Sequence, residues 1–408
     1  MNRAEHFDLI IVGGGMVGAA MACAMGDREL KVALIEGRVP DLSWPKAAYE
    51  NRVSAITRAS QYVFENLNAW PQMVNRRVSA YRKMEVWDST GGGHIHFDSA
   101  DIAEPDLGHI IENSVIQAAL WERLKQLPSV HCFAPATPKQ LQITQQQVSL
   151  TLDDGRLLEA DLIVGADGGR SWVRQQAGFE SKGWSYQQDA VVATVGHELS
   201  HQACCWQRFA ADGPLAFLPL DEKTCSIVWS TSPEHAEQLL ALNEVAFLKA
   251  LQLSFGDSLG KMCTVGERAA FPLRLAHTTR YTGLRLALIG DAAHSIHPLA
   301  GQGVNLGLGD MSSLADTLSA AKIRGENIGD MAVLRRYERA RKADNVLMMG
   351  AMDGFKRLFS NDQPVLRFAR NLGLSVTDRI SPIKQLFMQQ ALGLASNRSS
   401  LAKPPSNV

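Results

Sequence analysis

Four short apolar runs indicate that the chain alternates buried strands with helices. Leu9–Val12, Val32–Ile35, Leu162–Val164 and Leu286–Ile289 contain only apolar residues, and each is followed within two residues by a glycine. Their length suits one strand of a parallel sheet, which is apolar because both of its faces are buried. Stretches rich in small residues or in Leu and Ala follow the first and the last run. The pattern predicts a Rossmann-like α/β unit.

A different pattern fills residues 188–271. Short β-branched and aromatic runs alternate there with turn residues, which predicts a mainly antiparallel β-sheet. Residues 234–253 form a helical interruption in this region. Earlier in the chain, Met84–Trp87 and His94–Phe97 alternate apolar and polar residues, as half-buried strands do. Such a sheet can form one wall of a substrate pocket.

The first apolar run leads into a glycine motif. Gly13, Gly15 and Gly18 form G-x-G-x-x-G, and the small residues after them predict a helix. The glycines provide a tight turn, a backbone that can touch a pyrophosphate, and close helix–strand packing. Glu36 follows about 20 residues later, where a carboxylate binds a ribose hydroxyl. The motif predicts a bound adenine dinucleotide, and by itself it does not distinguish FAD from NAD.

Two further loops follow predicted strands. Asp167 lies at the carboxyl end of a strand, where α/β sheets bind ligands, although it could instead cap the next helix. Asp291 can accept hydrogen bonds from sugar-like hydroxyls. The glycine-containing loop after Asp291 exposes backbone N–H groups that suit an electron-rich ring edge. Arg52 precedes another predicted helix, and it could reach a phosphate or a flavin edge, or could be a surface arginine.

Composition restricts the remaining classes of function. The chain is 46% hydrophobic and 20% charged with a net charge of −1, which fits a globular protein and gives no reason to expect nucleic acid binding. No stretch approaches the roughly 20 apolar residues of a transmembrane helix, and the N-terminus lacks a signal-peptide layout. The pairs His94-x-His96 and His294-x-x-His297 have no further ligands at suitable spacing, and the six cysteines are scattered. No metal site is therefore expected.

In their order along the chain, these motifs resemble the group A flavoprotein monooxygenases, the family of para-hydroxybenzoate hydroxylase. The resemblance rests on three blocks: Gly13-x-Gly15-x-x-Gly18, the loop Gly165-Ala-Asp167-Gly168, and the loop that runs from Gly290-Asp291 through Pro298 to Gly301-Gln-Gly303. It implies a Rossmann-like FAD-binding domain, an inserted antiparallel β-sheet substrate domain and a C-terminal helical segment.

Shorter phrases are similar to the hydroxylases of ubiquinone biosynthesis, for example Arg52–Ile56 and Leu107–Ser114. Within that family, Ser226–Ser230 and Leu334–Arg339 are most similar to the bacterial 2-polyprenylphenol (2-octaprenylphenol) hydroxylases. This resemblance implies NAD(P)H- and O₂-dependent hydroxylation of a polyprenylated phenol at ring carbon 5. Hydroxylation at the demethoxyubiquinone step is the alternative, and a flavin oxidase or dehydrogenase is a third interpretation.

The resemblance also implies roles for individual residues. The ADP half of FAD would be held by Gly13, Gly15, Gly18 and Glu36. Arg52 and Asn113 would contact the pyrophosphate or ribityl region, Asp167 would face the pyrophosphate, and Asp291 would bind the ribityl chain. The isoalloxazine ring would be lined by Pro298, Gly301, Gln302, Gly303 and Asn305. No catalytic side chain is assigned, because the cofactor supplies the chemistry.

The resemblance divides the chain into alternating segments. The FAD-binding domain would comprise residues 1–80, 109–183 and 273–345, and the substrate domain residues 81–108 and 184–272. Residues 346–408 would form the C-terminal helical segment, which is rich in Met and basic residues. A polyprenylphenol is almost insoluble, so we expect a cytoplasmic enzyme in which this segment contacts the inner-membrane surface or other ubiquinone-biosynthesis proteins. A homo-oligomer is compatible with the sequence.

Overall fold

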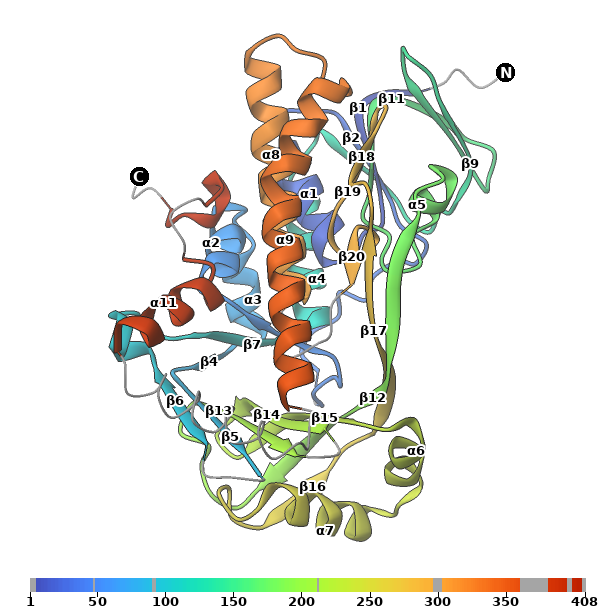
Figure 1. Cartoon of the computed structure of the whole chain (residues 1–408). Helices are drawn as coiled ribbons and strands as arrows, with labels where there is room; N and C mark the ends of the chain where they lie inside the picture. Colours follow the sequence, from blue (N-terminus) through green and yellow to red (C-terminus); the bar gives the residue numbers. More distant parts are fainter. Residues whose placement is uncertain are drawn as a thin grey trace.

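The computed structural model describes residues 5–46, 48–89, 93–210, 213–295, 303–359, 381–394 and 398–405. Two layers are evident in Figure 1: a helix-covered mixed sheet with a parallel centre in the upper half and a largely antiparallel sheet below it. Two long strands, β12 (Ser181–His197) and β17 (Ala269–Thr278), run from one layer to the other. The expected combination of a Rossmann-like domain and an antiparallel sheet is confirmed.

The upper sheet is built around β1 (Glu5–Val12), which is fully buried from Leu9 to Ile11. It pairs in parallel with β11 (Leu157–Gly165) on one side and with β2 (Val32–Ile35) on the other. The strand order is β18-β19-β11-β1-β2-β8, and β10 joins β9 to β11. The other strands are β8 (Val130–Phe133), β9 (Pro138–Ile143), β10 (Val148–Leu152), β18 (Thr282–Gly283) and β19 (Leu286–Leu288).

Helices cover the centre of this sheet because its central strands β1 and β2 are apolar on both faces. Nine of the eleven residues of α1 (Met16–Gly26) are buried, and its small side chains allow close packing on β1. The long α8 (Gly303–Ile323) packs against α1 and against α9 (Met331–Phe359). The remaining helices of this layer are α2 (Arg58–Asn66), α3 (Trp70–Arg76), α4 (Asn113–Leu124) and α5 (Trp172–Gln176).

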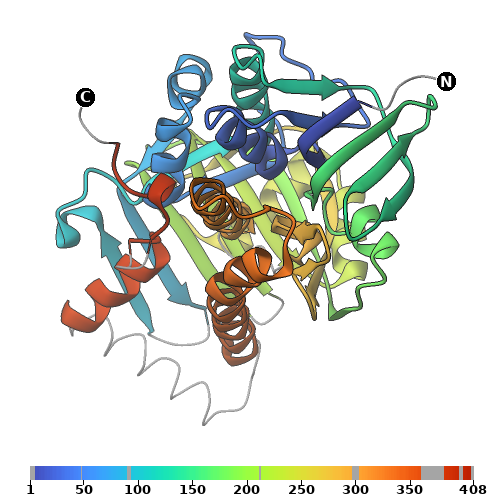
Figure 2. The same ribbon diagram turned by 90° about the horizontal axis from the view of Figure 1, so that it is seen from above.

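A small sheet lies between the two layers, with the order β3-β7-β4. Its strands are β3 (Val53–Ile56), β4 (Ser79–Tyr81) and β7 (Gly108–Glu112). Helix α11 (Ser381–Ala391) lies at the edge of the molecule in both Figure 1 and Figure 2. Short 3-10 turns cover η1 (Ser99–Ile102), η2 (Gly290–Ala292) and η4 (Ser400–Ala402).

The lower sheet has the order β20-β17-β12-β15-β14-β13-β5-β6, and β16 pairs with β12. Only β5 and β13 run parallel. Its further strands are β5 (Lys83–Asp88), β6 (His94–Asp98), β13 (Cys204–Ala210), β14 (Gly213–Asp221), β15 (Thr224–Thr231), β16 (Met262–Val265) and β20 (His294–Ser295).

One face of the lower sheet is covered by helices and the other faces the upper layer. Leu215 and Phe217 of β14 point toward α6 (Pro233–Ala241) and α7 (Glu244–Phe255), where Phe217 and Phe255 have ring centres 4.0 Å apart. The predicted helical interruption over residues 234–253 is thus two helices. The second begins anew because the Asn243 side chain caps it by accepting a hydrogen bond from the N–H of Ala246.

Candidate active site

A cavity of about 520 Å³ lies between the upper layer and the lower sheet. The upper layer lines it with the end of the glycine motif at Gly15–Val17, with Asn51–Ser54 and with Asn113. The lower sheet lines it with alternate residues of its central strands, among them Val192, Ala216 and Val228. A second, more open hollow shares Gly15, Arg52 and Asn113 with the cavity. The two hollows therefore adjoin at the N-terminus of α1.

The glycine motif has the geometry that its sequence predicts. Gly13 has a φ of +104°, and a Cβ there would lie 2.4 Å from the carbonyl oxygen of Ala166. A Cβ on Gly18 would lie 1.9 Å from the carbonyl oxygen of Gly13. Gly15 differs, because a Cβ there would meet no atom within 4 Å. Gly15 is also the N-cap of α1 and offers no capping side chain. The first turn of α1 thus has no capping side chain, and the open space beside Gly15 forms a cradle that fits a pyrophosphate.

Side chains behind the glycine motif hold it in place. Glu36 Oε2 accepts a hydrogen bond of 2.7 Å from the N–H of Gly14. On α4, Trp121 Nε1 and Gln117 Nε2 donate to the carbonyl oxygen of Gly14 at 2.8 and 3.0 Å. The sequence analysis did not identify these two α4 residues, because they lie more than 100 positions from the motif and follow no local pattern.

Both carboxylate oxygens of Asp167 accept hydrogen bonds from residues a few positions further along the chain. Oδ1 accepts from the hydroxyl of Ser171 at 2.5 Å and Oδ2 from the N–H of Val173 at 3.0 Å. The contacts of Asp167 therefore agree with the interpretation that it caps α5. Its neighbours Ala166 and Gly168 line the cavity. The buried Arg174 was not predicted. It joins this loop to the Asp291 loop by donating to the carbonyl oxygens of Gly169 and Ala292 at 2.7 and 2.8 Å.

Arg52, Asn113 and Asp291 come together at the cavity from three separate parts of the chain. The backbone carbonyl of Arg52 accepts a hydrogen bond from the N–H of Asn113, and its guanidinium lies 5.6 Å from the ring centre of Phe271. Asn113 Oδ1 accepts from Ser54 at 2.7 Å. Desolvation by the surrounding protein raises the pKa of Asp291, and the charges of His294 and Arg52 act against that rise.

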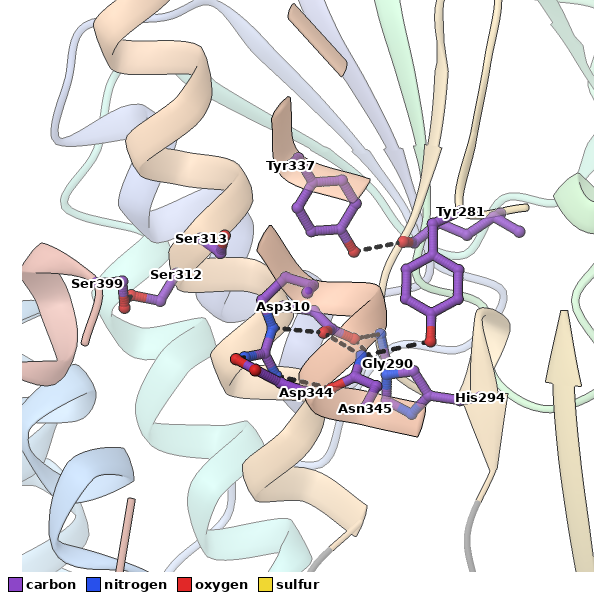
Figure 3. A network of polar contacts seen from close by, with 12 residues as sticks. Tyr281, Gly290, His294, Asp310, Ser312, Ser313, Tyr337, Asp344, Asn345 and Ser399 are labelled. Carbon is purple, nitrogen blue, oxygen red and sulfur yellow. Dashed lines mark hydrogen bonds and ion pairs between the residues drawn. The ribbon is translucent and has the colours of Figure 1, made fainter. Parts of the chain in front are cut away.

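A buried polar network holds the start of the Asp291 loop (Figure 3). Its centre is Asp310 of α8, whose Oδ2 accepts from the N–H of Gly290 at 3.2 Å and contacts His294 Nε2 at 2.5 Å. Asp310 Oδ1 accepts from Arg341 Nε at 3.0 Å and from Asn345 Nδ2 at 2.8 Å, both on α9. The network ties the loop to the two longest helices and was not foreseen from the sequence.

Of the remaining predicted residues, Gly303 and Asn305 lie in the first turn of α8, whereas the sequence analysis had placed Gly303 in the preceding loop. Gly303 lines the cavity. The Asn305 side chain ties α8 to the upper layer, donating to the carbonyl oxygen of Ala55 at 2.8 Å and accepting from the N–H of Thr57 at 3.1 Å. Three further predicted residues, Pro298, Gly301 and Gln302, lie outside the described residues.

The histidine pairs have protein partners in the described part of the chain. His294 contacts Asp310, and His94 and His96 lie 2.5 and 2.6 Å from the carboxylate of Glu85. His297 lies outside that part. Within the residues described, no group of three or more His, Cys, Asp or Glu side chains is arranged to hold a metal ion. No helix of these segments is long and apolar enough to span a membrane.

Comparison with known proteins decides the family. Residues 6–349 match the family model described as the FAD binding domain. The ubiquinone hydroxylase UbiL of Rhodospirillum rubrum is 39% identical over 386 residues, covering 95% of this chain and 89% of the relative. The 3-demethoxyubiquinol 3-hydroxylase of Escherichia coli is 39% identical over 387 residues, covering 95% and 98%. The chain belongs to the FAD-dependent hydroxylases of ubiquinone biosynthesis.

The fold of this hydroxylase agrees with that assignment. The solved structure of p-nitrophenol 4-monooxygenase PnpA from Pseudomonas putida superposes with a TM-score of 0.78 at 17% identity, covering 95% of this chain and 98% of PnpA. The hydroxylase is an FAD-dependent monooxygenase with NAD(P)H as its reductant. When bound, FAD accepts electrons from NAD(P)H and activates O₂ for transfer of one oxygen atom to the substrate. The open space at Gly15 and the uncapped N-terminus of α1 fit its pyrophosphate.

Proposed function

We propose that this hydroxylase adds an oxygen atom to the ring of a polyprenylated phenol, at carbon 5 of 2-polyprenylphenol. The observation that carries the proposal is the position of the cavity. It begins at the N-terminus of α1 and ends against an apolar face of the lower sheet, where Val192, Ala216 and Val228 provide the wall. An aromatic ring placed against this face would lie beside a cofactor whose phosphates occupy the cradle at Gly15.

The cofactor would be held along the upper layer. Gly13, Gly15, Gly18 and Glu36 would position the ADP half, since Gly15 opens onto the cavity and Glu36 orders the glycine motif. Arg52, Asn113 and Asp167 would serve the pyrophosphate and ribityl region, with Asp167 acting through its loop. Asp291 would accept hydrogen bonds from the ribityl hydroxyls. The segment containing Pro298, Gly301, Gln302, Gly303 and Asn305 would line the ring.

The lower sheet would orient the substrate and exclude water. Its cavity-lining residues include no carboxylate, imidazole, thiol or phenol among the described positions, and Asp291 of the upper layer is the only acidic residue that lines the described cavity. An apolar wall keeps water from the reacting atoms and so favours transfer of oxygen to the ring over its loss. We further propose that residues 1–80, 109–183 and 273–345 bind FAD and that residues 81–108 and 184–272 bind the substrate.

A second candidate is hydroxylation at the demethoxyubiquinone step. The 39% identity to the E. coli 3-demethoxyubiquinol 3-hydroxylase, over 98% of that enzyme, supports this candidate as well as the first. The two reactions require the same cofactor and a similar cavity. They differ in the oxygen substituents that the ring already carries, so direct identification of the substrate separates them.

The deciding experiment is mass spectrometry of quinone-pathway lipids from cells that lack this protein, grown in air, with cells carrying the restored gene as control. Accumulated 2-polyprenylphenol supports hydroxylation of carbon 5. Accumulated demethoxyubiquinone assigns the later step instead. A second assay uses purified holoenzyme with NAD(P)H and a short-chain analogue of each compound. If the enzyme oxidises NAD(P)H but hydroxylates neither analogue, both candidates are wrong.

Residues 346–408 would bring the enzyme to its insoluble substrate, at the inner-membrane surface or on another ubiquinone-biosynthesis protein. Val346 and Leu347 of α9 support this proposal, because their side chains are 48% and 69% exposed at the start of the segment. The basic residues Arg367, Arg370 and Arg379 lie outside the described residues. Replacing all three by Gln should shift the protein from the membrane fraction to the soluble fraction, and an unchanged distribution would contradict the proposal.

A further inference from the structure

Among the described cavity-lining residues of strands β12 to β15, two polar side chains interrupt an otherwise apolar wall. Gln207 of β13 and Ser230 of β15 both line the cavity, and they are only 6% and 2% exposed. In the part of the chain that the structure describes, neither side chain forms a hydrogen bond to another residue. Neither has a fully enclosed polar atom without a partner, so their polar atoms face the cavity that both residues line. Buried amides and hydroxyls are almost always paired in native proteins, because leaving them unpaired is costly. Their position at the cavity indicates that their partner is a molecule inside it.

The register of the lower sheet places Gln207 in an otherwise apolar row. Gln207 lies opposite Ala216, Ala216 opposite Val228, and Val228 opposite Val192. These four side chains occupy the same face, since each lines the cavity. Along β15, Ser230 follows Val228 by two positions and therefore projects to the same side. These strands thus offer an apolar surface with one amide at one end of a row and one hydroxyl in the next row.

We propose that Gln207 and Ser230 determine substrate specificity by hydrogen bonding to the oxygen substituents of the ring. This inference rests on the proposed function, because it takes an oxygen-bearing aromatic ring as the ligand. An amide can donate to or accept from a ring hydroxyl but cannot remove its proton. Gln207 therefore orients the ring, and Ser230 provides a second position for an oxygen. An analogue without the ring hydroxyl leaves the buried amide unpaired.

The test measures binding of two probes to the FAD-loaded enzyme. One probe is a short-chain 2-prenylphenol, and the other is the matching prenylbenzene without the hydroxyl. Wild-type enzyme should bind the phenol more tightly. Gln207→Leu, which keeps the size of the side chain, should weaken phenol binding by about tenfold and change prenylbenzene binding by less than about twofold. Ser230→Ala should act in the same sense for a probe that carries a second ring oxygen.

Val228→Ala is the matched control, because Val228 lies in the same row and is apolar. It should weaken both probes by a similar factor, as loss of packing does. Binding is read from the perturbation of the flavin absorption spectrum, which reports on the site without turnover. If Gln207→Leu retains the wild-type preference for the phenol, or if wild-type enzyme has no preference, the inference is overturned while the proposed function stands. If wild-type enzyme binds neither probe, the proposed function itself fails.

Discussion

The imidazole of His294 and the carboxylate of Asp310 lie 2.5 Å apart, with side chains that are 1% and 0% exposed. Burial by itself would raise the pKa of Asp310. The charges of His294 and Arg341 and the hydrogen bonds from His294 and Asn345 outweigh burial and lower that pKa to about 2. A carboxylate that stays charged at neutral pH can hold the N–H of Gly290. The network in Figure 3 therefore positions the loop that carries Asp291.

Replacing Asp310 with Asn should destabilise the protein strongly. The change leaves the buried guanidinium of Arg341 without its counter-charge and removes the carboxylate that contacts His294, which costs about 3–5 kcal/mol of unfolding free energy. Urea unfolding measures this loss. The matched control is Asp344→Asn, which removes a carboxylate that is 68% exposed and 3.4 Å from the same Arg341. That exposed pair should contribute less than about 1 kcal/mol, and equal losses for the two variants would contradict the prediction.

The low pKa of Asp310 also predicts how stability changes in acid. A carboxyl whose folded-state pKa lies below its unfolded value of about 3.9 contributes stability above that value and loses it as pH falls toward about 2. The difference in stability between wild-type protein and Asp310→Asn should therefore be constant above about pH 5 and shrink between about pH 4 and pH 2. Urea unfolding at a series of pH values checks this, and parallel profiles would rule it out.

Two glycines of the same motif should respond differently to alanine. Gly15→Ala adds a Cβ that meets no protein atom, so the apoprotein should keep its stability to within about 1 kcal/mol while its affinity for FAD falls at least about tenfold. Gly18→Ala places a Cβ 1.9 Å from the Gly13 carbonyl oxygen and should destabilise the fold itself. Thermal unfolding of the apoproteins and FAD titration separate the two effects. Normal FAD affinity in Gly15→Ala would contradict the placement of the pyrophosphate beside Gly15.

Asp291 should make FAD affinity dependent on pH. Because desolvation raises its pKa, the carboxylate becomes protonated at a higher pH than a free Asp, and a protonated carboxyl is a poorer acceptor for ribityl hydroxyls. Affinity should fall as pH is lowered through that raised pKa. Asp291→Asn should bind FAD about tenfold more weakly at neutral pH and abolish this dependence. Flavin fluorescence during FAD titration measures both.

A second variant, Arg52→Gln, tests the same dependence of FAD affinity on pH. The charge of Arg52 lowers the pKa of Asp291, so Arg52→Gln should move the decline in FAD affinity to higher pH. A uniform loss of affinity at every pH would instead indicate that Arg52 acts on a phosphate alone.

The sequence was sufficient to predict the features that depend on a few consecutive residues. The turn at Gly13, the open backbone at Gly15 and the packing of Gly18 on Gly13 all occur within one strand, loop and helix. Steric limits on a short segment act in any fold, so the residue types alone imply that geometry. The strand ends at Asp167 and Asp291 were predictable for the same reason, because apolar runs mark where parallel strands stop.

Only the tertiary structure decided which distant side chains serve the site. Trp121 forms a hydrogen bond to Gly14, which lies 107 positions away in the chain. Asn305, predicted to line the ring, forms a hydrogen bond to Ala55, which lies 250 positions away. For Asp167 the sequence left two interpretations open, and the fold brought both of its oxygens to α5. Gln207 and Asp310 belong to no local motif. The role of a polar side chain depends on its burial and on its hydrogen-bond partners, and packing determines both. Strand register and helix packing join residues far apart in the chain, and no short pattern encodes them.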